Sequence, residues 1–220
     1  MRIVLLGATG LVGNHLLAQL LSSSDNNDVL VLGRTAPVVT DKRITFIQSD
    51  LSNKTELLQI LTEHKEQHSV DILISCLGTT IKAAGSKQAF FRVDHDLILN
   101  TAGAARQYGI ERMMLVSAIN ADAKSRVFYS KVKGQTEQDL ISLGFKQLIL
   151  IKPSLLMGSR GEFRLAESFS APFMKLINPL LTGAVKKYRA IEGGDVAKCM
   201  VEQLKNPKQG VLEVYPADFL

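Results

Sequence analysis

Cysteine is scarce in this sequence, which contains only Cys76 and Cys199 among its 220 residues. Two cysteines so far apart supply neither a disulfide framework nor the clustered ligands of a zinc site, so we expect no metal and a reducing compartment. The sequence also lacks a secretory signal, because residues 2–6 enter a strand-like run without a basic region, a long apolar stretch or a cleavage site. These absences predict a cytoplasmic protein.

Long apolar runs and clustered charges are missing as well. Lys152 and Pro153 interrupt the most hydrophobic run, residues 148–157, whereas a membrane helix needs ~20 uninterrupted apolar residues. Basic residues exceed acidic ones by five, but they are spread along the chain without a recognition motif for nucleic acid. We therefore expect neither a membrane span nor a nucleic-acid partner. The hydrophobic share of 46% and charged share of 21% are typical of a globular enzyme.

Short apolar runs rich in isoleucine, valine and leucine alternate along the chain with longer amphipathic segments. Runs of this length and composition are typical of buried parallel strands. We expect strands over Ile3–Leu6, Val29–Leu32, Ile44–Ile47, Asp71–Ser75, Met113–Ser117 and Leu148–Lys152, and a last edge strand over Val211–Val214. We expect helices over Leu11–Leu21, Lys54–Thr62, Gln88–Gln107, Ser130–Leu143 and Asp195–Lys205.

This alternation predicts an α/β fold with a doubly wound, mostly parallel Rossmann-type sheet and helices on both faces. No linker-like stretch or internal repeat divides the chain, so residues 1–220 are expected to form a single domain. Residues 154–190 contain Pro172 and Pro179. We expect residues 154–190 to form a small helical lobe on the substrate side.

Three glycines follow the first expected strand and open the first helix. Gly7 allows a tight turn, Gly10 leaves room for a pyrophosphate, and Gly13 lets the helix lie close to the strand. The backbone amides and the positive helix end then bind the phosphates. The position of the triplet between strand and helix favours a dinucleotide site over an ordinary strand-to-helix turn.

Arg34 and Thr35 follow the second expected strand, where an NAD enzyme carries an acidic residue for the ribose hydroxyls. A guanidinium pairs with the 2′-phosphate of NADP and gains little from a bare hydroxyl, and Thr35 adds a hydroxyl donor. The sequence therefore predicts NADP(H) in preference to NAD(H). The alternative is a solvated arginine at the end of a strand.

Two further strand ends face the same crevice, because ligands of open α/β sheets bind outside the carboxyl ends of the strands. Asp50, followed by Leu51, is expected to accept a hydrogen bond from the adenine amino group, or else only to cap the next helix. The small segment Cys76, Leu77 and Gly78 lets the backbone approach the ribose on the nicotinamide side.

Tyr129 and Lys133 lie one helical turn apart, on the same face of an expected helix. A phenol has a pKa near ~10, so a neighbouring ammonium is needed for proton transfer near neutral pH. Tyr129 is expected to be the acid/base of a carbonyl reduction, with Lys133 lowering the pKa of Tyr129 and holding the nicotinamide ribose. The alternative is a surface pair on an amphipathic helix.

The glycine turn, the strand ending in Ser117 and the Tyr129/Lys133 motif resemble the short-chain dehydrogenase/reductase superfamily. Segments 76–80, 91–94 and 129–134 resemble its atypical branch, which contains the Tat-interacting oxidoreductase-like proteins, and the likeness runs over most of the chain. Together with this resemblance, the expected cofactor-binding residues are Gly7, Thr9, Gly10, Leu11, Val12, Gly13, Arg34, Thr35, Asp50, Leu51, Cys76, Leu77, Gly78, Tyr129, Lys133 and Pro153.

The chain departs from the superfamily at the catalytic serine, which usually stands second in a Ser-Ser pair. Here that position is Ala118, and Ser117 is the nearby hydroxyl, so the catalytic set is expected to be Tyr129, Lys133 and Ser117. Asp94 stands where many extended members have a structural asparagine, although the Tat-interacting branch has the aspartate too.

These residues lead to two main hypotheses. The first is an NADP(H)-dependent oxidoreductase that transfers hydride to or from a small carbonyl or alcohol, with a homodimer as a possible assembly. The second is a catalytically weak NADP(H)-binding regulatory or redox-sensing protein, which Ala118 favours. A sugar-nucleotide epimerase is a weaker third hypothesis, because the chain is short for the larger substrate lobe.

Overall fold

The computed structural model describes residues 1–64, 70–157, 190–206 and 208–216. Its main sheet has seven strands in the order β3-β2-β1-β4-β5-β6-β9, and every pairing is parallel. The expected Rossmann-type sheet is therefore confirmed, with each main-sheet strand within one residue of its predicted bounds. The strands are β1 (Arg2–Leu6), β2 (Asp28–Gly33), β3 (Ile44–Gln48), β4 (Ile72–Ser75), β5 (Arg112–Val116), β6 (Gln147–Ile151) and β9 (Gly210–Val214).

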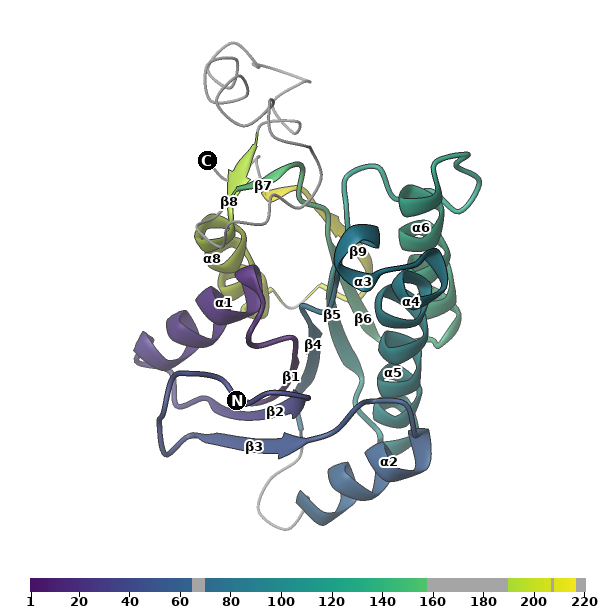
Figure 1. The fold of residues 1–220 in the computed structure, drawn as a ribbon. Helices are drawn as coiled ribbons and strands as arrows, with labels where there is room; N and C mark the ends of the chain where they lie inside the picture. The colour runs from purple at the N-terminus through teal and green to yellow at the C-terminus, as the bar shows by residue number, and fades with distance from the viewer. Residues whose placement is uncertain (65–69, 158–189, 207, 217–220) are drawn as a thin grey trace.

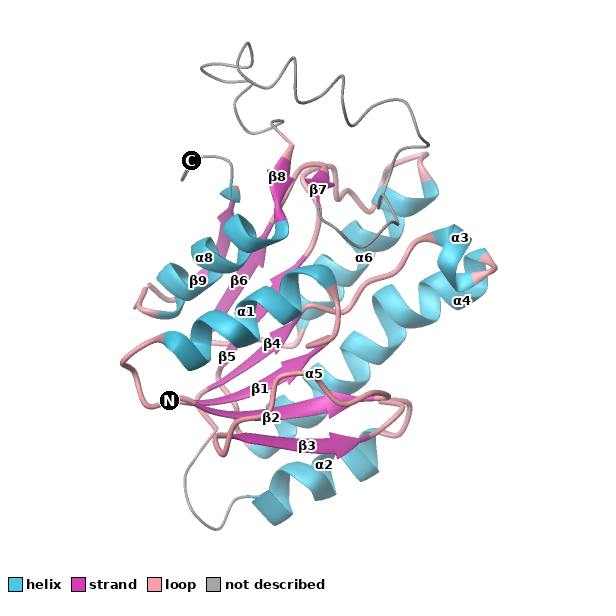
Figure 2. Cartoon of the chain, turned by 60° about the vertical axis from the view of Figure 1, so that its left-hand side comes forward, coloured by secondary structure: helices cyan, strands magenta, loops and turns pink. Residues whose placement is uncertain are grey.

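Helices cover both faces of this sheet (Figure 1). On one face lie α1 (Leu11–Ser22) and α8 (Gly193–Leu204), and on the other lie α2 (Lys54–Glu63), α5 (Leu97–Tyr108) and α6 (Phe128–Ser142). Figure 2 shows α1 and α8 side by side in front of the strands. None of the helices formed by the described residues is long and apolar enough to cross a bilayer.

The alternation of side chains in β1 explains the two helical layers. Ile3 and Leu5 pack in the core beneath α1 and α8, whereas Val4 and Leu6 pack in the core beneath α2, α5 and α6. All four side chains are completely buried. A strand buried on both faces needs a continuous apolar run, which is why the strands appear in the sequence without polar alternation.

The strand order reverses direction at β1, which pairs with β2 on one side and with β4 on the other. Because the strands are parallel, their carboxyl ends all lie along one edge of the sheet. The helices that leave β1 and β4 run on opposite faces, so a crevice opens between them at this edge. The topology thus places the loops after β1, β4, β5 and β6 around one site.

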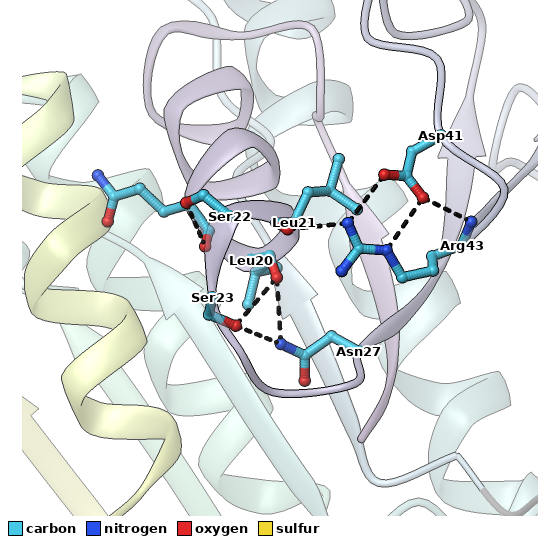
Figure 3. Close-up of polar contacts among 8 residues, drawn as sticks. Leu20, Leu21, Ser22, Ser23, Asn27, Asp41 and Arg43 are labelled. Atoms are coloured by element: carbon cyan, nitrogen blue, oxygen red, sulfur yellow. Dashed lines mark hydrogen bonds and ion pairs between the residues drawn. The ribbon is translucent and has the colours of Figure 1, made fainter.

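Polar contacts tie the end of α1 to the strands that follow it (Figure 3). The guanidinium of Arg43 donates 2.8 Å hydrogen bonds to the Leu21 carbonyl and to Asp41. The amide of Asn27 donates to the Leu20 carbonyl and to the Ser23 hydroxyl. These bonds satisfy carbonyl groups that a helix end leaves without partners, and they hold β2 and β3 in position beside α1.

Two features of the fold were not predicted. The expected helix over 88–107 is divided into α4 (Lys87–Phe91), a π-helical turn η2 (Arg92–Asp96) and α5, after the short helix α3 (Ile81–Ala84). A second sheet pairs β7 (Leu156–Met157) with β8 (Ile191–Glu192) in parallel, and two-residue strands are too short to show a periodicity. The rest of the expected substrate-side lobe, 158–189, lies outside the described residues.

Candidate functional site

The glycine turn joins β1 to α1 and permits a close backbone contact. Gly7 has a φ of 74°, and a Cβ at this residue would lie 2.7 Å from the carbonyl carbon of Cys76. A side chain is excluded both by the left-handed conformation and by the backbone that follows β4. Gly7 therefore lets the loops after β1 and β4 lie side by side, as a dinucleotide crevice requires.

Gly13 performs the second function expected of the triplet. A Cβ on Gly13 would lie 2.1 Å from the carbonyl oxygen of Gly7, so only glycine allows α1 to start this close to β1. Gly10 is the N-cap of α1 and, as a glycine, has no side chain to cap the helix, and the first turn carries no acidic residue. The first amides of α1, including those of Leu11 and Val12, thus face an open end that suits an anion.

A cavity of about 340 Å³ opens at the carboxyl edge of the sheet, beside the glycine turn. Eight of the expected site residues line it, from the ends of β4, β5 and β6 and from the N-terminal parts of α1 and α6: Val12, Cys76, Leu77, Gly78, Ser117, Tyr129, Lys133 and Pro153. Tyr129 and Lys133 therefore share one cavity with the loops around the cofactor turn. The proposed surface-pair alternative for these two residues is wrong, because Lys133 is 4% exposed and Tyr129 faces the cavity.

Tyr129 lies in the first turn of α6, which begins at Phe128. Its ring packs against Phe90 with the ring centres 5.6 Å apart, and Phe90 is completely buried. The close fit of Gly134 sets the loop before α6, because a Cβ at Gly134 would lie 2.1 Å from the backbone nitrogen of Ala123. The position of Tyr129 is therefore defined by aromatic packing and by a loop pressed against its own helix.

Lys133 forms a buried ion pair with Asp94. The Lys133 Nζ lies 2.8 Å from the Asp94 Oδ1, and the two side chains are 5% and 0% exposed. The other carboxylate oxygen of Asp94 accepts a 2.9 Å hydrogen bond from the Thr79 amide in the loop after β4. Asp94 thus connects the helix that carries Lys133 to a loop that lines the cavity.

The π-helical turn η2 brings Asp94 to this place. One extra residue in a helical turn shifts the side chains that follow it, and such turns occur frequently at functional sites. The Asp94 carbonyl also accepts a 2.9 Å bond from the Thr136 hydroxyl of α6. Asp94 therefore connects η2 to α6 through both its side chain and its backbone carbonyl.

Ser117 follows β5, and its hydroxyl donates a hydrogen bond to Glu137 of α6. The other oxygen of Glu137 lies 3.1 Å from the Lys152 Nζ, and Lys152 lies 2.8 Å from Glu213 of β9. Ala118, also buried, lines the cavity at the position where the superfamily has its serine. Ser117 thus borders the cavity, but its hydroxyl is hydrogen-bonded to Glu137.

Arg34 and Thr35 are exposed immediately beyond β2. The Arg34 side chain forms no hydrogen bond or ion pair with another residue that the structure describes, although the Arg34 carbonyl accepts a 3.3 Å hydrogen bond from Gln48. Neither residue lines the 340 Å³ cavity. They follow the carboxyl end of β2, one strand away from β1.

Asp50 and Leu51 follow β3 on the same side. Asp50 accepts a 2.8 Å hydrogen bond from the amide of Ser52 and a 2.5 Å hydrogen bond from its hydroxyl. Both bonds lower the pKa of Asp50, and the bond from the hydroxyl has the larger effect. Asn53 caps α2 by accepting from the amides of Thr55 and Glu56. The alternative in which Asp50 caps this helix is therefore wrong. Leu51 has a φ of 63°, a rare conformation for a residue with a side chain.

Several cavity residues were not among the expected site residues. All but Asp94 lie within three positions of a predicted site residue, so the rule that strand ends face the ligand was the available signal for most of them, whereas Asp94 comes from η2. Glu137 and Lys152 come instead from a helix interior and a strand end, and nothing in their spacing indicated that they would meet. The additional cavity residues are Thr79, Thr80, Asp94, Val116, Ala118, Ile119, Asn120, Val127, Ser130, Ser154, Leu155 and Leu156.

Cys199 lies buried in α8, away from the cavity. Burial, followed by the charge of Glu202, raises the pKa of the Cys199 thiol to about 12, which leaves it protonated and unreactive. Among the described residues, no group of three or more histidine, cysteine or acidic side chains is arranged to hold a metal ion.

The parallel sheet, the glycine turn and the cavity with Tyr129 and Lys133 define an NAD(P)-binding, oxidoreductase-like protein of the short-chain dehydrogenase/reductase type. The chain belongs to the NAD(P)H-binding family, whose model matches residues 7–207. The match begins at Gly7, the first glycine of the turn, and extends through α8.

Curated fungal proteins are similar over most of the chain. "Protein fmp52, mitochondrial" of Aspergillus niger is 33% identical over 204 residues, which cover 90% of this chain and 85% of the relative. The protein of the same name from Emericella nidulans is 35% identical over 176 residues, or 78% and 73%. These names contradict the expectation of a cytoplasmic protein. Scarce cysteine indicates a reducing milieu but does not identify which compartment provides it.

Solved structures share the fold at low sequence identity. The UDP-glucose 4-epimerase of Thermotoga maritima, in complex with UDP-glucose, aligns with a TM-score of 0.70 and 13% identity over 97% of this chain and 76% of its own. The enzyme WbmG of Bordetella bronchiseptica, in complex with NAD, aligns with a TM-score of 0.70 and 16% identity over 99% and 73%. At such low sequence identity, the similarity to these enzymes shows a shared fold and nothing beyond it.

Proposed function

We propose that this protein is an NADP(H)-dependent oxidoreductase of the atypical short-chain dehydrogenase/reductase type, which acts on a small carbonyl or alcohol with Tyr129 as acid/base. The observation that supports this proposal best is the single cavity that combines Tyr129 and Lys133 with the loops beside the glycine turn. We also propose that residues 1–220 form one domain with a substrate-side lobe at 154–190, and that a homodimer is the assembly.

The residues present fit a dinucleotide. A Cβ at Gly7 or Gly13 would fill the space of the turn, and the start of α1 presents amides without a competing side-chain cap or acidic residue. Gly7 to Gly13 would hold the pyrophosphate, Asp50 and Leu51 the adenine side, and Cys76, Leu77, Gly78 and Pro153 the nicotinamide side. When bound, the nicotinamide supplies or accepts the hydride.

Within the cavity, Tyr129 donates a proton to the substrate oxygen in reduction and accepts one in oxidation. The Lys133 ammonium, held by Asp94 at 2.8 Å, stabilises the negative charge of an ionised phenol and donates toward the ribose hydroxyls. Ser117 borders the same space and is the proposed hydroxyl that orients the substrate.

Replacing Tyr129 by phenylalanine should lower kcat by about 10²- to 10⁴-fold, because the proton donor is lost while the ring still packs against Phe90. The rate is measured as NADPH oxidation over a panel of small aldehydes and ketones. Tyr108→Phe is the matched control, since Tyr108 ends α5 at the opposite edge of the sheet. Equal rates for the wild type and Tyr129→Phe would refute the assigned role of Tyr129.

Replacing Arg34 by aspartate should weaken NADPH binding by about 10- to 100-fold, which corresponds to the ~1.5–3 kcal/mol of a charge-assisted hydrogen bond. NADH binding should change much less, because its ribose carries no 2′-phosphate. Calorimetric titration with both coenzymes measures the difference. Lys208→Asp makes the same charge change at the exposed Lys208, near the start of β9. Equal losses for the two coenzymes would argue against 2′-phosphate recognition.

A second function is a catalytically weak NADP(H)-binding regulatory or redox-sensing protein. Ala118 favours it, because the position of the superfamily serine has no hydroxyl and the Ser117 hydroxyl is engaged with Glu137. The two functions differ in one measurement. NADPH binding without turnover of any substrate by the wild type or by Tyr129→Phe would favour the regulatory protein.

A further inference from the structure

A chain of polar side chains leads from the cavity to the outer strand of the sheet. It starts at Ser117, whose hydroxyl donates to Glu137, and continues through Lys152 to Glu213, whose second oxygen accepts a 2.9 Å bond from Tyr215. Ser117, Glu137 and Lys152 are buried, but the Glu213 side chain is 47% exposed on β9. The buried part of this chain is therefore connected to solvent at one end and borders the cavity at the other.

In this row of polar side chains, the negative charges outnumber the positive ones. One ammonium, that of Lys152, faces two carboxylates, those of Glu137 and Glu213. The hydrogen bond from Lys152 lowers the pKa of Glu213. The pKa of Glu137 is raised: burial is the largest cause, the Ser117 hydrogen bond and the charge and hydrogen bond of Lys152 oppose it, and the charge of Glu213 adds to it. Of the two carboxylates, Glu137, next to Ser117, therefore takes up a proton before Glu213 does.

The protonation of Glu137 decides what the Ser117 hydroxyl can do. An ionised carboxylate is acceptor-only, so it takes the single proton of the hydroxyl and leaves none to point into the cavity. A protonated carboxyl donates to the Ser117 oxygen, and the Ser117 O–H then turns to another acceptor. Ser117 borders the cavity, where a substrate oxygen is the acceptor available.

We propose that Glu137 is a positioning residue whose protonation switches the Ser117 hydroxyl from a bond inside the protein to a bond with the substrate. This inference rests on the proposed function, because it assigns Ser117 to the substrate oxygen. The switch transfers one proton from solvent to the Glu137 carboxylate, where an O–H bond forms. The Ser117 O–H bond stays intact and only rotates to a new acceptor. It compensates for Ala118, since Ser117 supplies the hydroxyl that position 118 lacks.

The groups that face Glu137 come from every element packed around it. Lys133 precedes Glu137 by one turn on α6, and its ammonium is paired with Asp94. Ser117 faces it from the end of β5, Lys152 from the end of β6, and Glu213 from β9. Of these, Ser117, Lys152 and Glu213 act on the pKa of the Glu137 carboxyl, and the charge of Glu137 in turn helps to raise the pKa of Tyr215.

The first test is the pH profile of kcat for NADPH-dependent reduction. In the wild type, kcat should rise as the pH falls through the pKa of Glu137. In E137Q this rise should disappear and kcat should stay at the low-pH level, because Lys152 is donor-only and requires the amide oxygen, which leaves the amide NH₂ to donate to Ser117. If Glu137 had only a structural role, E137Q would instead lower kcat at every pH.

E213Q tests the electrostatic part of the switch without entering the core. It removes a negative charge that raises the pKa of Glu137 and lets Lys152 pair with Glu137 alone. The rise in kcat should therefore move to lower pH, with the low-pH level unchanged. An unshifted profile in E213Q, or a wild-type profile in E137Q, would overturn the proposal.

A second measurement does not depend on turnover. In protein labelled with carbon-13 at glutamate Cδ and serine Cβ, the Glu137 and Ser117 signals, assigned from E137Q and S117A spectra, should titrate together, and both midpoints should fall in E213Q. A Glu137 signal that stays ionised, or a Ser117 signal that does not follow it, overturns the inference. Calorimetry with NADPH on the same samples reports separately on the proposed function, whose failure appears as absent binding.

Discussion

Gly13→Ala is expected to destabilise the protein by roughly 3 kcal/mol or more, at the upper end of the cost of overpacking. The added Cβ would lie 2.1 Å from the carbonyl oxygen of Gly7 and 2.9 Å from its carbonyl carbon. Both are backbone atoms of the turn, so relief requires α1 to move away from β1. The amides at the start of α1 move with it, and NADPH binding should be lost in the same variant.

Urea unfolding measures the change in stability, and calorimetry measures binding of NADPH. Gly103→Ala is the control, because Gly103 also lies within a helix but its Cβ would meet only the flexible end of Lys54, at 3.2 Å. Alanine is favoured over glycine in a helix by about 1 kcal/mol, so this variant should be as stable as the wild type or more so. A Gly13→Ala protein with unchanged stability and affinity would contradict the close approach of α1 to β1.

Asp94→Ala is expected to destabilise the protein by about 3–5 kcal/mol, because it leaves the buried Lys133 charge without its partner. The ion pair is 2.8 Å long, with side-chain exposures of 5% and 0%. The Thr79 amide also loses its acceptor. Glu111→Ala is the matched control, since it breaks the exposed Lys146–Glu111 pair and should cost less than about 1 kcal/mol.

A double variant separates the loss of the pair from the loss of packing. Asp94→Leu combined with Lys133→Met removes both charges, and apolar replacement of a buried pair is often neutral or stabilising. Its free energy of unfolding should therefore exceed that of Asp94→Ala. If the double variant is the less stable of the two, the unpaired charge is not what destabilises Asp94→Ala.

The local parts of the fold were predictable from the sequence. The seven main-sheet strands, the helices and the glycine turn each depend on neighbouring residues: apolar runs for strands buried on both faces, and glycines where a Cβ has no room. Helix α1 was predicted to within one residue of its observed bounds, Leu11–Ser22. Tyr129 and Lys133 were predicted to share a face because four residues make one turn.

Contacts between distant segments were not predictable in the same way. Asp94 reaches Lys133 because a π-helical turn interrupts an otherwise regular helix, and the apolar pattern of that helix does not reveal the interruption. Ser117, Glu137, Lys152 and Glu213 lie on four different elements and meet through the order of β5, β6 and β9 in the sheet. None of these pairings has a characteristic sequence spacing.

The sequence by itself determined the class of fold, the place of the cofactor turn and the candidate acid/base pair, because each depends on interactions within a few residues or on the period of one element. Only the tertiary structure decided the partners of the buried charges: Asp94 for Lys133, and Glu137 for Ser117 and Lys152. A charge removed from water must find its counter-charge in space, and the packing of strands and helices, not their order in the chain, brings the two together.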